Sequence, residues 1–404
     1  MPGEADLKSL DSVLEKENAA GMYAMEKTID LVTDNSLTTA ERAQYKAEAK
    51  IFRAMVMFDM VRLWGDFPVI TTVAGDITSE NIDEVYPQYF PEQNTELEAY
   101  QQIERDLLDA VLYAPDNTPG NKTLFSKSVA RTLLAKIYAE KPLRDYTKVI
   151  QYCDEVKADG FDLVDDFSDL FGMNAAGTDA KMRNTKESIL EAQFTSGAGN
   201  WCTWMFGRDL VNWNNNFTWA KWVTPSRDLI SAFKQEGDEV RFKESIVYYD
   251  CNWSNYYPSD NYPFMYKCRS ANSSIIKFRY ADVLLLKAEA LIMQDTPDLE
   301  GAADIIDKVR DRAKLGALPT SVRSNKNVLL NALLKERRLE LAFEGQRWFD
   351  LVRLDKVEEV MNAVYAKDSG RKAQIYTFDK NSYRLPIPQS VIDANDKIHQ
   401  NPGY

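Results

Sequence analysis

The sequence predicts a mainly α-helical protein, built from helical hairpins and interrupted by one loop-rich, aromatic insertion with a few short strands. Apolar side chains recur at steps of three and four residues along most of the chain, which is the period of a helix. Between residues 161 and 275 that period fades, and Gly, Asn and aromatic residues take over. The hairpins resemble degenerate tetratricopeptide units, although no strict 34-residue repeat is visible.

The expected helices are delimited by capping residues, glycines and prolines at the ends of the periodic stretches. The first two form an antiparallel pair, and the last residues, which carry three prolines, are expected to run extended over the helices. The helices are expected from about Ser9 to Val32, Thr39 to Trp64, Thr95 to Tyr113, Ser126 to Glu140, Tyr146 to Ala158, Ser226 to Gln235, Tyr280 to Gln294, Leu299 to Lys314 and Val357 to Ala366.

The helix expected after Thr38 or Thr39, either of which is a suitable N-cap, is apolar nearly all round. Such a helix is buried in a globular protein, so we expect it to be central. Its charged residues Arg53, Asp59 and Arg62 must then find partners inside the fold, because an unpaired buried charge is costly.

The segment Asn331–Arg353 combines the helical period with a regular series of charges. Gly345 lies where the pattern turns, so two helices, or one bent helix, are expected to meet there. Opposite charges three or four residues apart can pair along a helix face. The pairs that this spacing predicts are Arg337–Glu340, Glu344–Arg347 and Asp350–Arg353.

Three carboxylates in this segment, Glu336, Glu340 and Glu344, are spaced at i, i+4 and i+8. A metal or acid–base site is one interpretation, but bundle-type di-metal sites add a His three residues after a Glu. The only histidine of the chain is His399, in the tail. We therefore interpret the row as a structural lattice of ion pairs with the neighbouring arginines.

The composition narrows the functional classes. Charged residues make up 27% and hydrophobic residues 45% of the 404, as in an ordinary folded protein. The formal net charge of −13 argues against a nucleic-acid partner, since binding phosphates requires clustered Lys and Arg. No apolar run approaches the ~18 residues of a spanning helix, and the acidic N-terminus does not resemble a secretory signal.

No metal, cofactor or catalytic residue is predicted. The four cysteines form no CxxC and have no clustered His, which disfavours a zinc site. Cys251 and Cys268 either bridge a hairpin or are buried thiols. The stretch after Asp250 begins like a calcium loop but lacks its glycine and its glutamate. No Ser or Cys has an identifiable base to activate it.

The strongest local anomaly is the stretch Trp201–Tyr266, which holds 17 of the chain's Phe, Trp and Tyr and six of its eight tryptophans. Asparagines are interleaved with these rings. Flat aromatic faces beside short amides suit ring stacking and hydrogen bonds to sugar hydroxyls. The alternative is that the rings pack an irregular loop layer onto the helices. The predicted ligand-binding residues are Trp201, Trp204, Trp213, Asn215, Trp219, Trp253 and Tyr256.

Four stretches, in order, resemble the SusD/RagB family of outer-membrane nutrient-binding lipoproteins. They are AEAKIFRAMVMFDMVRLWGDFPVI (Ala47–Ile70), IKFRYADVLLLKAEALI (Ile276–Ile292), LLKERRLELAFEGQRWFDLVRL (Leu333–Leu354) and LPIPQSVIDANDKIHQNPGY (Leu385–Tyr404). A weaker match is WVTPSRDLISAFKQEGDEVRF (Trp222–Phe242). Together these matches span nearly the whole chain from about Ala20.

The resemblance implies a single domain over residues 1–404, in which four tetratricopeptide-like units form a right-handed superhelical scaffold. The scaffold is expected over residues 20–160 and 276–366, the ligand-binding region over 161–275 and an extended packing tail over 367–404. The implied function is non-catalytic capture of glycans, at the outward face of the outer membrane, for a TonB-dependent transporter.

The sequence also departs from the family pattern. Family members begin with a signal peptide and a lipid-modified cysteine, and neither is present here, so a trimmed or short divergent member is expected. Membrane attachment is expected only through such a lipid anchor. The rival functions are peptide capture within the same family and, in another class, a glycoside hydrolase with a pair of carboxylates 5 to 10 Å apart. A cytoplasmic helical-repeat scaffold is the third alternative.

Overall fold

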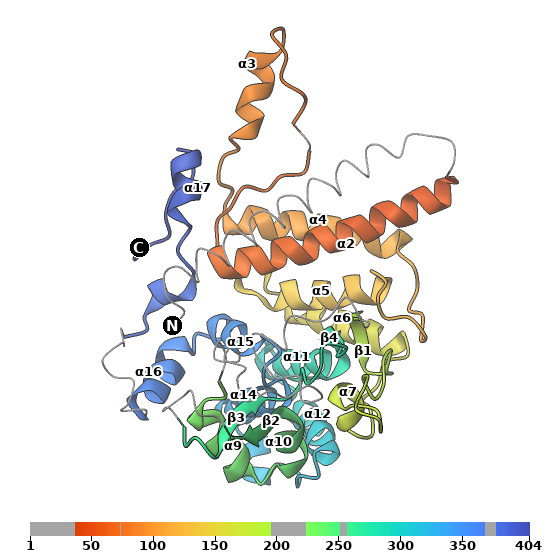
Figure 1. Ribbon diagram of the computed structural model, residues 1–404, viewed down its shortest axis with the longest axis vertical. Coiled ribbons are helices and arrows are strands. Elements are labelled where there is room, and N and C mark those ends of the chain that lie inside the picture. The colour runs from red at the N-terminus through yellow and green to blue at the C-terminus, as the bar shows by residue number, and fades with distance from the viewer. Residues whose placement is uncertain (1–36, 73, 195–223, 251–256, 368–376) are drawn as a thin grey trace. The chain divides into compact units, whose positions relative to one another are not determined.

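The structure is a computed structural model that describes residues 37–72, 74–194, 224–250, 257–367 and 377–404. The chain divides into two compact units. The first unit comprises Met1–Asp116, Phe125–Asp145 and Leu351–Tyr404, and the second comprises Asn117–Leu124 and Tyr146–Asp350. Each unit is mainly helical (Figure 1). The expected boundaries of scaffold, insertion and tail remain predictions.

The first unit is built on three helices, α2 (Thr39–Trp64), α4 (Glu96–Tyr113) and α5 (Lys127–Ala139). Helix α2 packs against α4 and α5, and α4 packs against α5. Both long helices begin with a capping box, Thr38 with Glu41 and Thr95 with Glu98, which satisfies backbone donors that the first turn leaves unpaired. All three helices were expected from the sequence within a residue or two.

The charges of α2 find partners, as predicted. The Arg53 guanidinium donates to both carboxylate oxygens of Asp106 at 2.8 and 2.7 Å. Arg62 donates to Asp59 at 2.5 Å and lies over the Phe58 ring at 3.9 Å from its centroid. The bidentate pair fixes α2 against α4, because Asp106 lies on α4.

A hairpin-like lobe connects α2 to α4 and contains α3 (Ile82–Val85) and the 3₁₀ helix η1 (Tyr86–Tyr89). Its base is closed by an antiparallel bridge between Phe67 and Asn94. The lobe extends away from the helices of its own unit (Figure 1). The sequence predicted only a loop here, because two short helical turns leave no long periodic pattern.

The C-terminal residues belong to the first unit. They contain α16 (Val357–Lys367), which matches the helix expected from Val357 to Ala366, and then the 3₁₀ helix η4 (Lys380–Tyr383) and α17 (Gln389–Ala394). The Leu385 N–H donates to the Leu63 carbonyl at 2.7 Å, and the Asn401 amide donates to the Trp64 carbonyl at 2.8 Å. The tail therefore caps the C-terminal end of α2, whose last carbonyls lack helical partners.

The second unit has α11 (Tyr280–Met293) at its centre, which is buried on nearly every side. Helices α6 (Tyr146–Ala158), α12 (Leu299–Arg312) and α14 (Lys326–Glu340) pack against it. The unit also contains two short helices, α7 (Ser168–Phe171) and α13 (Thr320–Arg323), and α13 packs against α12 and α14. A helix that is apolar all round requires partners on all its faces, and the second unit supplies them.

Two antiparallel strand pairs accompany these helices, which agrees with the few short strands expected. Strand β1 (Ser188–Ala192) pairs with β4 (Ile275–Arg279), with two register shifts. Strand β2 (Ile246–Tyr249) pairs with β3 (Tyr262–Met265) in regular register. Helices α9 (Arg227–Glu236) and α10 (Glu239–Ser245) lead into β2.

The bend expected near Gly345 is present between α14 and α15 (Arg347–Arg353). Gly345 has φ +74°, and Phe343 has φ +66°. Glycine adopts this left-handed conformation without steric cost, whereas Phe343 adopts it only because its surroundings hold it there.

No helix among the described residues is long and apolar enough to cross a membrane. The helix expected from Ser9 to Val32 lies outside the described residues.

Candidate functional site

The predicted ligand-binding residues lie outside the part of the chain that the structure describes. They belong to two stretches, residues 195–223 and 251–256. The residues concerned are Trp201, Trp204, Trp213, Asn215, Trp219, Trp253 and Tyr256, together with Trp222. Their role in binding therefore stays a prediction. The structure does describe the residues that border these two stretches.

Those end residues are held together by hydrogen bonds. The Tyr257 hydroxyl, directly after the second stretch, donates to the Pro225 carbonyl at 2.7 Å. The Thr224 hydroxyl, directly after the first stretch, lies 2.6 Å from the Tyr262 hydroxyl. The Tyr257 and Tyr262 rings meet edge to face at 5.6 Å. The C-terminal ends of the two aromatic stretches thus share one anchor, which we call the tyrosine anchor (Thr224, Pro225, Tyr257 and Tyr262).

Helix α9 and strand β3 hold the residues of the tyrosine anchor in place. Helix α9 starts directly after it, where the Ser226 hydroxyl accepts a hydrogen bond from the Leu229 N–H at 3.1 Å. Tyr262 is the first residue of β3 and pairs with Tyr249 of β2. A helix start and a strand start thereby fix the two sides of the anchor.

The described aromatic residues of the stretch Trp201–Tyr266 pack into the fold. Phe233, Tyr262 and Phe264 are buried, and Tyr257 packs partly buried against the clusters that contain them. Phe264 lies 5.0 Å from Tyr262 and 6.5 Å from Tyr249, measured between ring centroids. For these residues the packing interpretation holds, and the ligand interpretation applies only to the two stretches beyond the anchor.

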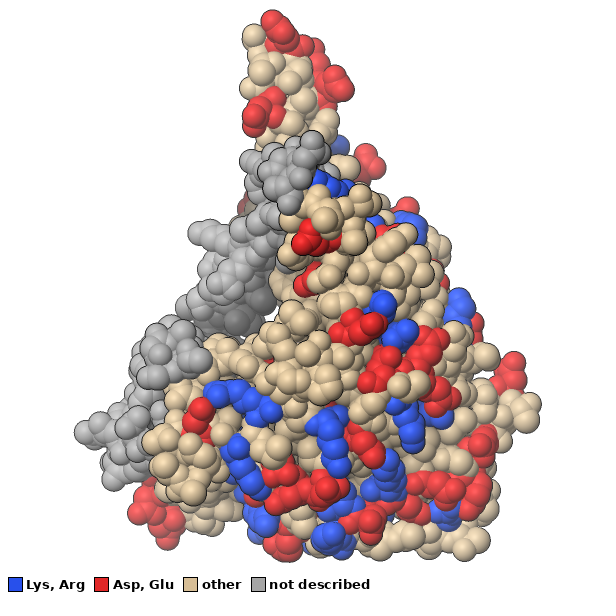
Figure 2. Space-filling model, turned by 90° about the vertical axis from the view of Figure 1, so that its right-hand side faces the viewer, with Lys and Arg blue, Asp and Glu red and all other residues tan. Residues whose placement is uncertain are grey.

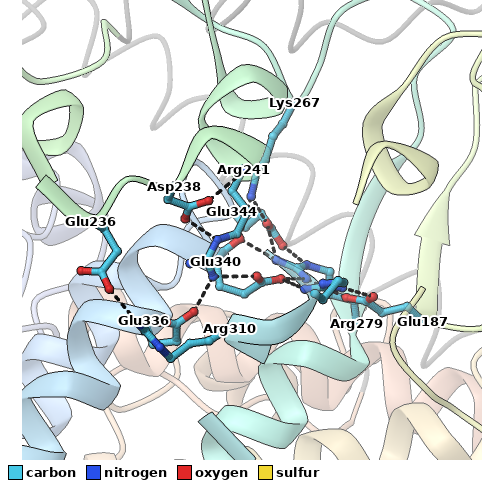
Figure 3. A network of polar contacts seen from close by, with 11 residues as sticks. Glu187, Glu236, Asp238, Arg241, Lys267, Arg279, Arg310, Glu336, Glu340 and Glu344 are labelled. Carbon is cyan, nitrogen blue, oxygen red and sulfur yellow. Dashed lines mark hydrogen bonds and ion pairs between the residues drawn. The ribbon is translucent and has the colours of Figure 1, made fainter. Parts of the chain in front are cut away.

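The second unit also contains a large network of buried charges (Figure 3). Glu336 and Glu340 come from α14, and Glu344 from the bend after it. Their cationic partners come from α10, the loop after β3, the end of β4 and α12: Arg241, Lys267, Arg279, Arg310 and Arg312. Glu187, Glu236 and Asp238 complete the network.

Glu340 is the centre of this network and is fully buried. Its carboxylate accepts from Arg279 at 2.6 Å, from Arg241 at 3.1 Å and from Arg312. Burial raises the pKa of the Glu340 carboxyl, but Arg312, Arg279 and Arg241 outweigh burial and hold that pKa well below its usual range. Glu340 is therefore a permanent anion that joins four elements.

Lys267 is the cation of the network whose pKa is lowered by burial. Its ammonium donates to Glu344 at 2.5 Å and to the Glu340 carbonyl at 2.8 Å, and it lies 4.8 Å from the Phe171 ring centroid. Burial lowers the pKa of Lys267 to about 8, although Glu344 opposes the change.

The ion-pair interpretation of Glu336, Glu340 and Glu344 is supported, but the predicted partners were wrong. Glu340 pairs with arginines of other elements, and Glu344 pairs with Lys267 and Arg279. Arg347 instead donates to the Leu334 carbonyl at 2.9 Å. For Glu344 and Arg347 the i, i+3 spacing fails because α14 ends at Glu340, so the helix geometry that such a pair needs is not present there. Arg337 lies within α14 but donates to Asp282 and Asp350.

The network is suited to holding the fold together. Glu336 and Glu340 have 2% and 0% of their surface exposed, so neither is accessible to a substrate. Each is hydrogen-bonded to arginine. Among the described residues, no group of three or more His, Cys, Asp or Glu side chains is arranged to hold a metal ion.

A small hollow of about 190 Å³ lies between α6, α11 and α12, where no site was expected from the sequence. Its floor is apolar, with Tyr280, Val283 and Leu284, and its rim carries lysines. Lys287, on the rim, is paired with Asp154 at 2.5 Å, and Lys308 with Asp162 at 2.6 Å. These two lysines are therefore paired with carboxylates of the same unit.

Comparisons with known proteins agree on one family. A model described as the SusD family matches residues 262–404, and a model described as "Starch-binding associating with outer membrane" matches residues 19–139. A SusD-like protein of Formosa agariphila is 28% identical over 407 aligned positions, which cover 89% of this chain and 74% of that protein.

Solved structures show the same fold. A laminarin-binding SusD-like protein has a TM-score of 0.75 at 22% identity, with 97% of this chain and 86% of that chain covered. A SusD superfamily protein from Bacteroides vulgatus has a TM-score of 0.77 at 18% identity, with 98% and 86% covered. Both sequence identities are low, so this likeness establishes the fold alone, which is helical and tetratricopeptide-like.

Proposed function

Because the chain belongs to the SusD/RagB family, we propose that it is a non-catalytic binding protein that captures glycans at the cell surface. We further propose that it delivers them to a TonB-dependent transporter of the outer membrane. The description of one matching family model as starch-binding and associated with the outer membrane supports both the ligand class and the location. The laminarin-binding protein of the same fold supports the ligand class.

The tyrosine anchor is the observation in this chain that carries the proposal. It joins the ends of two stretches that together contain Trp201, Trp204, Trp213, Trp219, Trp222 and Trp253. Two stretches that end at one rigid place can bring their aromatic side chains into one binding surface. Binding residues often lie on segments that a rigid scaffold holds in this way. Rings and neighbouring amides on such a surface match the faces and hydroxyls of a sugar.

Two alternative functions, peptide capture and glycoside hydrolysis, would require other features of the binding site. A peptide-binding member of the family would use the same loops, but with pockets for side chains rather than ring stacking. A glycoside hydrolase would need an exposed carboxylate pair 5 to 10 Å apart, with one acid of raised pKa. Burial raises the pKa of Glu336 despite Arg241, but that carboxyl is buried in the charge network and does not meet the accessibility requirement.

A retention assay on polysaccharide gels tests the proposal. The purified chain is run through gels containing laminarin, starch and other glycans, with a panel of peptides as competitors and with analysis of released products. Retardation by at least one glycan, without released oligosaccharide, is the expected result. Retention that only peptides compete for, or product formation, would assign the chain to one of the two alternatives.

A further inference from the structure

The hollow between α6, α11 and α12 has the size and the apolar lining of a small-molecule site, and all of its lining belongs to the second unit. Its volume of about 190 Å³ exceeds the roughly 150 Å³ that hold one benzene molecule in an engineered protein core. Val283, Leu284 and Ile305 supply apolar walls. Apolar walls with a few polar groups are the usual composition of a ligand site.

Tyr280, the first residue of α11, places a hydrogen-bond donor in this hollow. The residue is only 1% exposed, yet its hydroxyl has no hydrogen-bond partner among the described residues. The titratable groups close enough to act on its phenol are Asp162, Cys153 and Asp154, and the last two also line the hollow. The hydroxyl therefore lies at the end of the ring that faces the hollow. A buried hydroxyl without a partner is destabilising until an acceptor reaches it.

The Tyr280 hydroxyl can act only as a neutral group at physiological pH. Burial raises the pKa of its phenol, and the neighbouring titratable groups raise that pKa further. The hydroxyl therefore keeps its proton and can donate it. The acceptor that strengthens such a hydrogen bond most is an ionised oxygen, since charge-assisted hydrogen bonds are roughly twice as strong as neutral ones.

The rim of the hollow carries one lysine more than its ion pairs use. Two rim lysines are paired with aspartates, as described above, and the other carboxylate of the lining, Asp304, pairs with Arg323 at 2.5 Å. Figure 2 shows that Lys and Arg lie beside Asp and Glu on the face that it presents. Lys157 departs from this arrangement, because it is exposed at the end of α6 and forms no ion pair within the described part of the chain. A ligand with one negative charge would complete the pairing.

An apolar body with one carboxylate meets all of these requirements together. Inorganic phosphate or sulfate would leave the apolar walls without contacts. A sugar ring would turn hydroxyls toward Val283 and Leu284, which cannot form hydrogen bonds with them. A neutral hydrocarbon would leave the Tyr280 hydroxyl without an acceptor.

We propose that this hollow binds a small organic carboxylate of about the size of benzoate. The Tyr280 hydroxyl donates to the carboxylate, Lys157 neutralises it, and the apolar walls contact the rest of the ligand. The site shares no residue with the tyrosine anchor. The inference is therefore independent of the proposed glycan capture, and each can fail without the other.

The experiment measures the Kd of benzoate for the full chain by ligand-observed NMR, with benzyl alcohol as the uncharged probe of similar shape. Tyr280→Phe removes the donor and keeps the ring, and Lys157→Gln removes the unpaired charge. Lys234→Gln is the matched control for Lys157→Gln. Lys234 is also exposed in the last turn of a helix, its carbonyl also accepts from the glycine three residues later, and it forms no ion pair with any described residue.

The parent is expected to bind benzoate more tightly than benzyl alcohol. Tyr280→Phe should weaken benzoate binding about ten-fold, the size expected for a hydrogen bond to a charged group, and should weaken benzyl alcohol less. Lys157→Gln should weaken benzoate binding about three-fold, as for an exposed ion pair, with no change in Lys234→Gln. All variants should melt at the temperature of the parent and be retained on glycan gels as the parent is.

Three results would overturn the inference. Absence of benzoate binding at millimolar concentration by the folded parent would reject the site. Equal affinities for benzoate and benzyl alcohol, or unchanged benzoate binding in Tyr280→Phe, would show that the hollow is an apolar cavity without a carboxylate site. Loss of glycan retention in Tyr280→Phe or Lys157→Gln would assign the hollow to the glycan surface instead.

Discussion

Arg337 and Asp350 form a bidentate, buried pair across the bend between α14 and α15. The Arg337 guanidinium donates to the two carboxylate oxygens of Asp350 at 2.9 and 2.8 Å, and it also donates to Asp282 on α11 at 2.7 Å. One arginine thereby joins three helices. The bend that contains Gly345 and Phe343 is held from both sides by this contact.

Removing one partner of this pair should destabilise the second unit strongly. Asp350→Ala removes one of the carboxylates that neutralise the buried Arg337 charge, so we expect a loss of about 3 kcal/mol in the free energy of unfolding. Urea unfolding followed by circular dichroism measures it. Glu359→Ala, which breaks the exposed pair with Lys356, is the control and should change stability by less than about 1 kcal/mol. Equal effects of the two variants would contradict the structural role of the buried pair.

Stability should rise with pH where Lys267 loses its proton. Burial lowers the pKa of Lys267 to about 8 in the folded protein, whereas the unfolded chain has the ordinary value. Below pH 8 both states hold the proton, so the buried charge exerts its full destabilising effect. Between about pH 8 and pH 10 the unfolded chain binds more protons than the folded protein, and folding gains up to about 3 kcal/mol.

Lys267→Met isolates this effect from other groups that titrate in the same range. The free energies of unfolding of parent and variant are compared at pH 7 and pH 10. We expect the parent to gain stability relative to the variant as the pH rises. A constant difference across that range would show that Lys267 keeps an ordinary pKa.

The tryptophan prediction concerns the two stretches, residues 195–223 and 251–256, that border the tyrosine anchor. We expect at least two of the single variants Trp201→Ala, Trp204→Ala, Trp213→Ala, Trp219→Ala, Trp222→Ala and Trp253→Ala to weaken binding to a retained glycan about thirty-fold each. Trp222 is the weakest candidate, since it adjoins the start of α9. Gel retention and calorimetry measure the loss. Tyr113→Ala removes an exposed ring on α4 and serves as the control. Unchanged retention in every folded variant would show that these rings only pack.

Hydrolysis should not occur with any retained polysaccharide. Incubation over days is expected to release no oligosaccharide, because Asp238 and Glu336, the described carboxyls whose pKa is raised, are buried and inaccessible to a polysaccharide. Chromatography of the supernatant provides the measurement. Steady release that disappears in a single Glu→Gln or Asp→Asn variant would place the chain among glycosidases.

The helices were predictable from the sequence because their signals are local. Thr38 with Glu41 and Thr95 with Glu98 mark two helix starts within four residues of chain. The apolar period then determines each helix up to the Gly or Pro that ends it. The bend at Gly345 was predictable for the same reason, since glycine is the residue that favours a positive φ.

The charge network was predictable in kind but not in its partners. Burial of an arginine-rich helix requires counter-charges, so a lattice of ion pairs was a sound expectation. Glu340 meets Arg279 and Arg241, which are 61 and 99 residues away along the chain, and no local spacing contains that information. Phe343, with its positive φ, gave no signal either. The predicted ligand residues remain a prediction for a different reason, since they lie outside the described residues.

The tyrosine anchor has a consequence for how binding preference can be exchanged between relatives. The hydrogen bonds from Tyr257 to Pro225 and between Thr224 and Tyr262 involve a carbonyl, two phenols and one hydroxyl, none of which belongs to the stretches that they delimit. Stretches of other lengths and compositions can therefore be grafted ahead of these anchor residues without altering α9, β2 or β3. A chimera that keeps these four residues and receives the two loops of a relative should acquire the donor's sugar preference while unfolding at the recipient's temperature.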